Sequence, residues 1–135
     1  MNAPPLRRIL ETALYIEDLD AAETFYRDAL GLEVIMRTDG RDVFFRCGDS
    51  MLLIFNPHVS AVPEHRVPTH GAHGPGHMAF GADAAGLEAW RARLQEHGIP
   101  IERDIEWPNG ARSIYFRDPG DNSIEIATPS LWNLA

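Results

Sequence analysis

The sequence predicts an α+β fold built from two copies of one βαβββ module. The order strand, helix and three strands runs over about residues 8–57 and recurs over about residues 76–129. The strand segments alternate apolar and polar residues, which is typical of half-buried strands. Each helical segment ends at a glycine, Gly31 or Gly98, as helices often do. We therefore expect one domain spanning residues 1–135, with mixed or antiparallel sheets.

The first module follows from local signals. A strand is expected over residues 8–16, and Asp18 or Asp20 can cap a helix that continues to Leu30. Asp39-Gly40 is a hairpin signal. It separates a strand at residues 32–38 from one at residues 42–47, and a fourth strand is expected at residues 51–55.

The second module repeats this plan. We expect a strand at residues 77–82, a helix at residues 85–96, and strands at residues 99–105, 111–117 and 123–127. A loop over residues 56–75, rich in Pro, His and Gly, joins the modules. A loop of this length inside a compact domain usually has a function or is mobile.

Strand alternation also predicts which side chains face which way. The residues expected to pack against the helices are Leu52, Ile54, Phe80, Ile124 and Ile126. The residues expected to face a cleft between the modules are Phe44, Arg46, Leu53, Ser113 and Tyr115.

Composition excludes some classes of partner. The net charge of −8 argues against binding to a nucleic-acid backbone. No apolar run approaches the roughly 18 residues of a membrane span, and the first residues lack the apolar stretch of a signal peptide. Cys47 is the only cysteine, so no internal disulfide can form. These features favour a cytoplasmic protein.

Three polar residues in otherwise apolar strands predict a metal site. Glu11 and His77 occupy equivalent positions in the two modules, and a pseudo-twofold axis would bring them close to Glu125. Taken singly, each carboxylate could lie on a solvent-exposed face of a sheet, and the histidine could have only a structural role. Taken together, they would need a cation if buried. Such mixed ligands suit a divalent ion of Zn, Fe, Mn, Ni or Co.

The fourth symmetry-related position holds Leu53, which cannot bind a metal. Three protein ligands and open positions are typical of a catalytic site. Tyr115 either donates a proton or hydrogen bond there, or only packs. His70 and His73 lie in the central loop, where a solvated or supporting role is favoured over direct ligation.

Several segments carry a resemblance to the vicinal oxygen chelate superfamily. They are the opening from Glu11 to Leu19 and residues 25–32, 76–80 and 115–125. This superfamily includes glyoxalase I, fosfomycin-modifying enzymes, extradiol dioxygenases and bleomycin-resistance proteins. The resemblance implies a glyoxalase-like mixed-sheet cleft, commonly a homodimer, and metal ligands Glu11, His77 and Glu125.

The resemblance also implies what kind of chemistry to expect. A divalent metal would bind two vicinal oxygens of a small substrate and act as a Lewis acid in lyase, isomerase or dioxygenase chemistry. Glu11, Glu125 and Tyr115 are the catalytic candidates, and Phe44, Arg46, Leu53 and Ser113 the substrate-binding candidates. Leu53 stands where glyoxalase I typically has a fourth ligand, and Glu11 where extradiol dioxygenases have a histidine. The alternative is a bleomycin-resistance-like protein that sequesters a small ligand without catalysis.

Overall fold

The computed structural model describes residues 2–64 and 66–135 and confirms the α+β class. The first module contains β1 (Glu11–Tyr15), α1 (Leu19–Thr24), the π-helical turn η1 (Phe25–Ala29), β2 (Glu33–Thr38), β3 (Asp42–Cys47) and β4 (Ser50–Phe55). The second contains β5 (His77–Gly81), α3 (Ala84–Glu96), β6 (Arg103–Glu106), β7 (Arg112–Arg117) and β8 (Ser123–Ala127). A short helix, α2 (Pro57–Ser60), follows β4, and a 3-10 turn, η2 (Pro129–Trp132), follows β8.

Each module forms its own four-stranded sheet, and the two sheets have the same topology. The strand orders are β1-β4-β3-β2 and β5-β8-β7-β6, with the first pair of each parallel and the others antiparallel. The registers also correspond. Leu53 pairs with Phe44, just as Glu125 pairs with Tyr115. The predicted equivalence of Leu53 and Glu125 is therefore confirmed.

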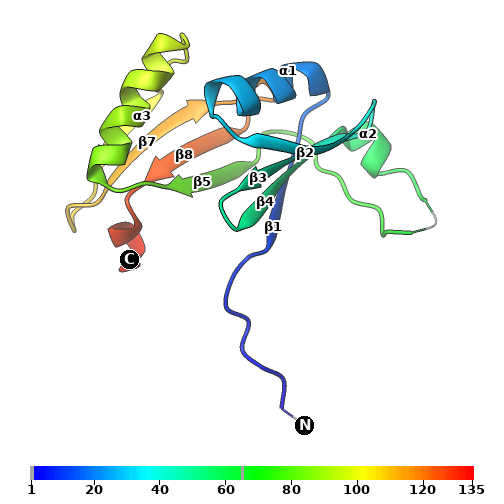
Figure 1. Cartoon of the computed structure of the whole chain (residues 1–135), viewed down its shortest axis with the longest axis horizontal. Coiled ribbons are helices and arrows are strands. Elements are labelled where there is room, and N and C mark those ends of the chain that lie inside the picture. The colour runs from blue at the N-terminus through cyan, green and yellow to red at the C-terminus, as the bar shows by residue number, and fades with distance from the viewer. Residues whose placement is uncertain (1, 65) are drawn as a thin grey trace.

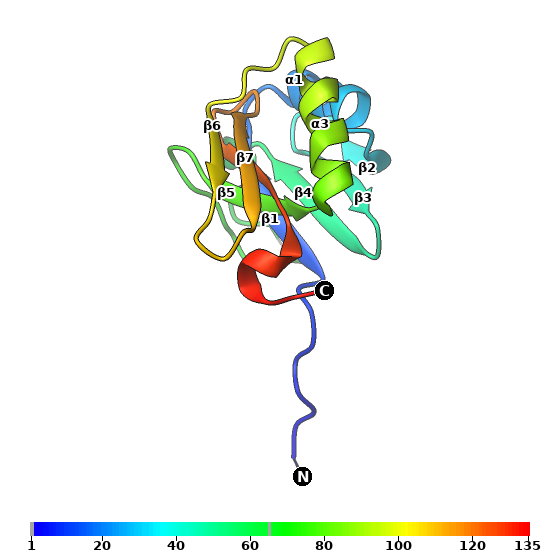
Figure 2. The same ribbon diagram turned by 90° about the vertical axis from the view of Figure 1, so that its left-hand side faces the viewer.

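The two modules share one hydrophobic core, to which α1 and α3 contribute from the same end of the molecule (Figures 1 and 2). The predicted core residues Leu52, Ile54, Ile124 and Ile126 are buried in it, and Phe80 packs against it. Polar contacts also cross between the modules. The buried Tyr26 hydroxyl donates to Asp118 at 2.7 Å, and Arg93 Nε donates to the Ala29 carbonyl at 2.7 Å.

Local signals place most element boundaries within a few residues of prediction. Asp18 caps α1 by accepting from the Ala21 N–H, and Gly31 and Gly98 adopt positive φ where the helices end. Two strands are shorter than expected. The strand predicted at residues 8–16 begins at Glu11, and the one at residues 99–105 begins at Arg103. No helix in the described part of the chain is long and apolar enough to cross a membrane.

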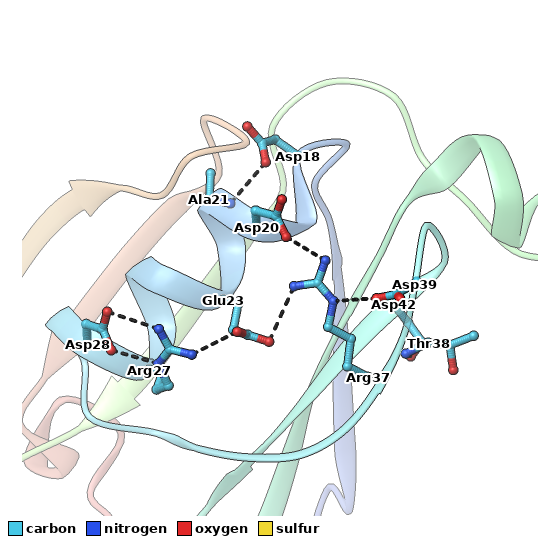
Figure 3. A network of polar contacts seen from close by, with 10 residues as sticks. All are labelled: Asp18, Asp20, Ala21, Glu23, Arg27, Asp28, Arg37, Thr38, Asp39 and Asp42. Atoms are coloured by element: carbon cyan, nitrogen blue, oxygen red, sulfur yellow. Dashed lines mark hydrogen bonds and ion pairs between the residues drawn. The ribbon is translucent and has the colours of Figure 1, made fainter.

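Ion pairs join α1 to the β2–β3 hairpin (Figure 3). The Arg37 guanidinium lies 2.6 Å from Asp20, 3.4 Å from Glu23 and 3.3 Å from Asp39. Exposed pairs of this kind contribute little singly, but here one partly buried guanidinium connects several carboxylates. The positive charge of Arg37 is therefore already paired with carboxylates on the helix side of the first sheet.

Candidate metal and substrate site

The second sheet brings His77 and Glu125 together. Glu125 lies on β8 and His77 at the start of the adjacent strand β5, and His77 Nε2 is 3.2 Å from Glu125 Oε1. Glu125 is only 6% exposed, whereas the His77 side chain is about half exposed. The pair therefore combines a buried carboxylate with an imidazole that solvent can reach.

The hydrogen of the His77 ring is fixed by the backbone. His77 Nδ1 lies 2.9 Å from the Ser123 carbonyl oxygen, which can only accept, so Nδ1 carries the hydrogen. Nε2 then presents a lone pair to the carboxylate, unless it is protonated too. Two lone pairs at this distance need a proton or a cation between them. An Nδ1–H bonded to a backbone carbonyl is also the usual support of a metal-binding histidine.

Glu125 is positioned by two hydroxyl groups that bond its other oxygen. Oε2 accepts from Ser113 Oγ at 2.7 Å and from Tyr115 OH at 3.0 Å. Burial, and secondarily the bond to Glu125, raise the pKa of Tyr115, so this phenol stays protonated and donates at neutral pH. Oε2 is thus satisfied, and Oε1 is left facing His77.

Trp107 completes this arrangement through a contact with Ser113 that the sequence did not predict. Its indole Nε1 donates to Ser113 Oγ at 2.9 Å, which orients the Ser113 hydroxyl hydrogen toward Glu125. Trp107 follows β6 in a turn, so strand alternation gives no signal for it. Ser113 is fully buried in the single chain, and its hydroxyl donates to Glu125. Its contact with substrate stays a prediction, and the structure adds a role in positioning Glu125.

Glu11 lies elsewhere in the single chain. It is exposed on β1, in the first sheet, and lines a hollow of about 1100 Å³ together with Phe44 and Leu53. Within residues 2–64 and 66–135, no three His, Cys, Asp or Glu side chains lie close enough to hold a metal ion. One chain therefore joins two of the three predicted ligands and leaves the third apart.

The single cleft expected between the modules is likewise not formed by one chain. The helix-facing sides of both sheets are buried in the shared core, so the opposite sides are turned away from it. Phe44 and Leu53 belong to the hollow over the first sheet, and Tyr115 contacts Glu125 on the second. Arg46 is exposed, lies 3.7 Å from Glu33 and does not line the hollow.

Of the two loop histidines singled out from the sequence, one lines the hollow and the other lies outside it. His70 lines the hollow, and its Nδ1 lies 2.8 Å from the Tyr15 hydroxyl. His73 lies near His58, with ring centroids 6.3 Å apart. His58 in turn contacts Glu17 at 2.8 Å, in a second histidine–carboxylate pair whose side chains are both mostly exposed.

The residues on the second sheet fit a divalent metal. Two ligands bound to one ion at about 2.1 Å each lie about 3.0–3.4 Å apart, and the His77–Glu125 distance of 3.2 Å falls in this range. The donors are an imidazole nitrogen and a carboxylate oxygen, both common ligands of Zn, Fe, Mn, Ni and Co. Their backbone and hydroxyl supports are of the kind that orients metal ligands.

Comparison with known proteins gives the family. The model of the Glyoxalase/Bleomycin resistance protein/Dioxygenase superfamily matches residues 8–126. Metallothiol transferase FosB of Staphylococcus epidermidis is 28% identical over 121 residues, covering 86% of this chain and 78% of the relative. Catechol-2,3-dioxygenase of Bacillus subtilis is 32% identical over 84% of this chain, which spans only 38% of that relative.

A solved structure agrees over nearly the whole chain. The crystal structure of lactoylglutathione lyase from Agrobacterium tumefaciens has a TM-score of 0.94 and 46% sequence identity. The match covers 97% of this chain and all of that one. Since the family model covers both modules, this chain belongs to the Glyoxalase/Bleomycin resistance protein/Dioxygenase superfamily.

Proposed function

We propose that this protein is a metal-dependent enzyme that acts on a small substrate through two neighbouring oxygen atoms. The observation that carries the proposal is the His77–Glu125 pair, whose facing atoms lie 3.2 Å apart and whose other polar atoms are satisfied. A buried carboxylate oxygen that faces an imidazole nitrogen at this distance needs a proton or a cation between the two atoms. When bound, a divalent metal would supply Lewis-acid polarisation of the substrate oxygens.

The proposed third ligand is Glu11 from a second copy of the chain. Glu11 is exposed on the first sheet, and the His77–Glu125 pair is open to solvent on the side of His77. A homodimer in which the first sheet of one copy faces the second sheet of the other would supply both parts of the site. Two such sites would arise by symmetry. Leu53 would face the same space without acting as a ligand.

The chain's own residues suggest how protons are handled. Ser113 and Tyr115 hold one oxygen of Glu125, so the other oxygen keeps a fixed direction. Tyr115 remains a donor because its pKa is raised by burial. A carboxylate, Glu11 or Glu125, is the proposed proton acceptor. Lyase, isomerase and dioxygenase chemistry are all compatible with this arrangement, and the names of the relatives span such different reactions.

Metal content is the experiment that tests the proposal. Protein purified without chelator should contain about one divalent ion per chain, measured by elemental analysis, and His77→Ala or Glu125→Gln should lose it. The pair His58 and Glu17 offers a matched control, because it is also a histidine–carboxylate contact. His58→Ala should keep the metal. Equal metal affinity in His77→Ala and the parent would contradict the proposal.

A second candidate is the binding protein that sequesters a small ligand without catalysis. The hollow over the first sheet favours it, because its floor is largely apolar. A protein of this kind would bind ligand without metal and release it unchanged. If His77→Ala loses the metal but still binds ligand, an activity measurement on the parent decides between the enzyme and the binding protein. A cytoplasmic location stays a prediction, as does the dimer.

A further inference from the structure

The hollow over the first sheet is large enough for more than a small chelating group. Its volume is about 1100 Å³, and drug-sized ligands typically occupy pockets of roughly 300–1,000 Å³. The sheet supplies an apolar floor, formed by Met36, Phe44, Met51, Leu53 and Phe55. Residues 66–70 of the central loop form part of the wall. Its volume and lining therefore indicate a binding space for a ligand larger than a chelating group.

Three rings form an aromatic corner in this hollow. Phe44 and Phe55 meet edge to face with centroids 5.3 Å apart, and Phe55 and His70 meet edge to face at 4.4 Å. The Tyr15 hydroxyl, 2.8 Å from His70 Nδ1, holds the imidazole in place. Such a corner offers ring faces and edges against which a flat apolar group can pack.

The two arginines of the hollow are already paired with its carboxylates. Arg41 lies 3.5 Å from Asp42 and 3.4 Å from Glu64, and Arg66 lies 3.8 Å from Glu64. Within the described part of the lining, each guanidinium therefore has a carboxylate within 4 Å. An anionic ligand would have to compete with Asp42 and Glu64 for the same cations.

We infer that the hollow binds the uncharged, flat, apolar body of the substrate, most simply an aryl group. The inference rests on the proposed function in one respect: the metal-binding oxygens of the substrate would lie at the end of the hollow that contains Glu11. Glu11 pairs with Met51, and Phe55 lies four residues further along β4. At about 3.3 Å per residue, Phe55 is about 13 Å from the Glu11 row, and Phe44, which pairs with Leu53, is about 7 Å from it. The substrate should be long enough to reach from the Glu11 row into this corner.

Charge distinguishes the substrate classes that the hollow would accept or reject. A glutathione conjugate carries two carboxylates, and a phosphonate carries a compact double charge. Either would place anions against Asp42 and Glu64 or over the apolar floor, where charge is costly. A neutral aryl compound with vicinal oxygens would place its ring at Phe44, Phe55 and His70 without that cost.

Two fluorescent probes that differ by one charge test the inference. N-phenyl-1-naphthylamine is neutral, and 1-anilinonaphthalene-8-sulfonate is the same ring system with a sulfonate. Both are titrated into the full chain in EDTA, so that binding does not depend on a metal. We expect the neutral probe to bind at least about tenfold more tightly than the sulfonate.

Neighbouring residues on β2 provide a matched pair of variants. Met36 lines the hollow and is 55% exposed, whereas Ile35 is 41% exposed and does not line it. Both tolerate polar replacement, because both already contact water. Met36→Glu should weaken binding of the neutral probe about tenfold, and Ile35→Glu should leave it within twofold. Phe44→Leu, which removes one ring of the aromatic corner, should also weaken it.

The outcomes separate this inference from the proposed function. Equal effects of Met36→Glu and Ile35→Glu, or tighter binding of the sulfonate than of the neutral probe, would overturn the inference. In that case a normal metal content, lost in His77→Ala, would leave the enzymatic proposal standing. Conversely, neutral-probe binding that responds to Met36→Glu, with a metal content that ignores His77→Ala, would support the aryl-binding hollow and overturn the enzymatic proposal.

Discussion

The two hydroxyl groups bonded to Glu125 allow a quantitative test of the candidate site. Ser113 and Tyr115 donate to the same oxygen, and Glu125 is 6% exposed, so water cannot readily replace Ser113. A hydrogen bond to a charged group contributes about 1.5–3 kcal/mol to the free energy of unfolding. We expect Ser113→Ala to cost about 2–3 kcal/mol. Tyr115→Phe should cost about 1 kcal/mol, because this side chain is partly exposed.

The double variant is the informative measurement. Either single variant leaves Glu125 Oε2 with one donor, whereas Ser113→Ala combined with Tyr115→Phe leaves it with none. An unsatisfied buried carboxylate oxygen carries its full desolvation cost. The loss in the double variant should therefore exceed the sum of the single losses by on the order of 1 kcal/mol. Urea unfolding in EDTA, monitored by circular dichroism, measures all three losses.

The same variants should weaken metal binding. Loss of a residue that orients a metal ligand typically lowers affinity about 10–100-fold, and equilibrium dialysis against Mn²⁺ or Ni²⁺ would measure it. Ser50→Ala is the control, because the Ser50 hydroxyl donates at 3.0 Å to the Cys47 carbonyl, outside this site. Additive stability losses together with unchanged metal affinity would refute the role assigned to the hydroxyl groups.

The remaining predictions concern the dimer, the module junction and pH. Mixing Glu11→Gln with His77→Ala chains should restore about a quarter of the metal sites lost in each parent, because a mixed dimer has one intact site; no recovery after refolding together would exclude a shared site. Gly120→Ala should cost about 1–3 kcal/mol in urea unfolding, since its Cβ would lie 2.8 Å from Ile16 Cγ1 and 3.0 Å from a β1 carbonyl; wild-type stability would show that β1 can move. Burial raises the pKa of Asp42 in the folded chain, so ionisation costs stability as pH rises above about 4. The stability of Asp42→Asn relative to the parent should therefore increase between about pH 4 and 7. A stability difference that decreases over this range would contradict a raised pKa of Asp42.

Local sequence determined the modules and the two faces of each strand. Strand alternation and helix-ending glycines depend on neighbours along the chain, so Leu52 and Ile54 could be assigned to the core and Leu53 to the other face. The same alternation placed Glu125 and Tyr115 on one face. The strand registers show that Asp42 of the first module and Ser113 of the second occupy corresponding positions. This correspondence was not predicted from the sequence.

Tertiary structure decided which polar groups meet. Trp107 reaches Ser113 from a turn whose course no periodicity describes, and His70 enters the hollow from a loop without a regular pattern. The position of Glu11 away from His77 depends on how whole modules pack, and the shared core brings together their helix-facing sides. A module can face the other module of its own chain or a module of a second copy, and its local contacts are the same in both cases. The sequence repeat therefore predicts the three ligands. Only the packing of the modules decides that one chain brings two of them together, His77 and Glu125.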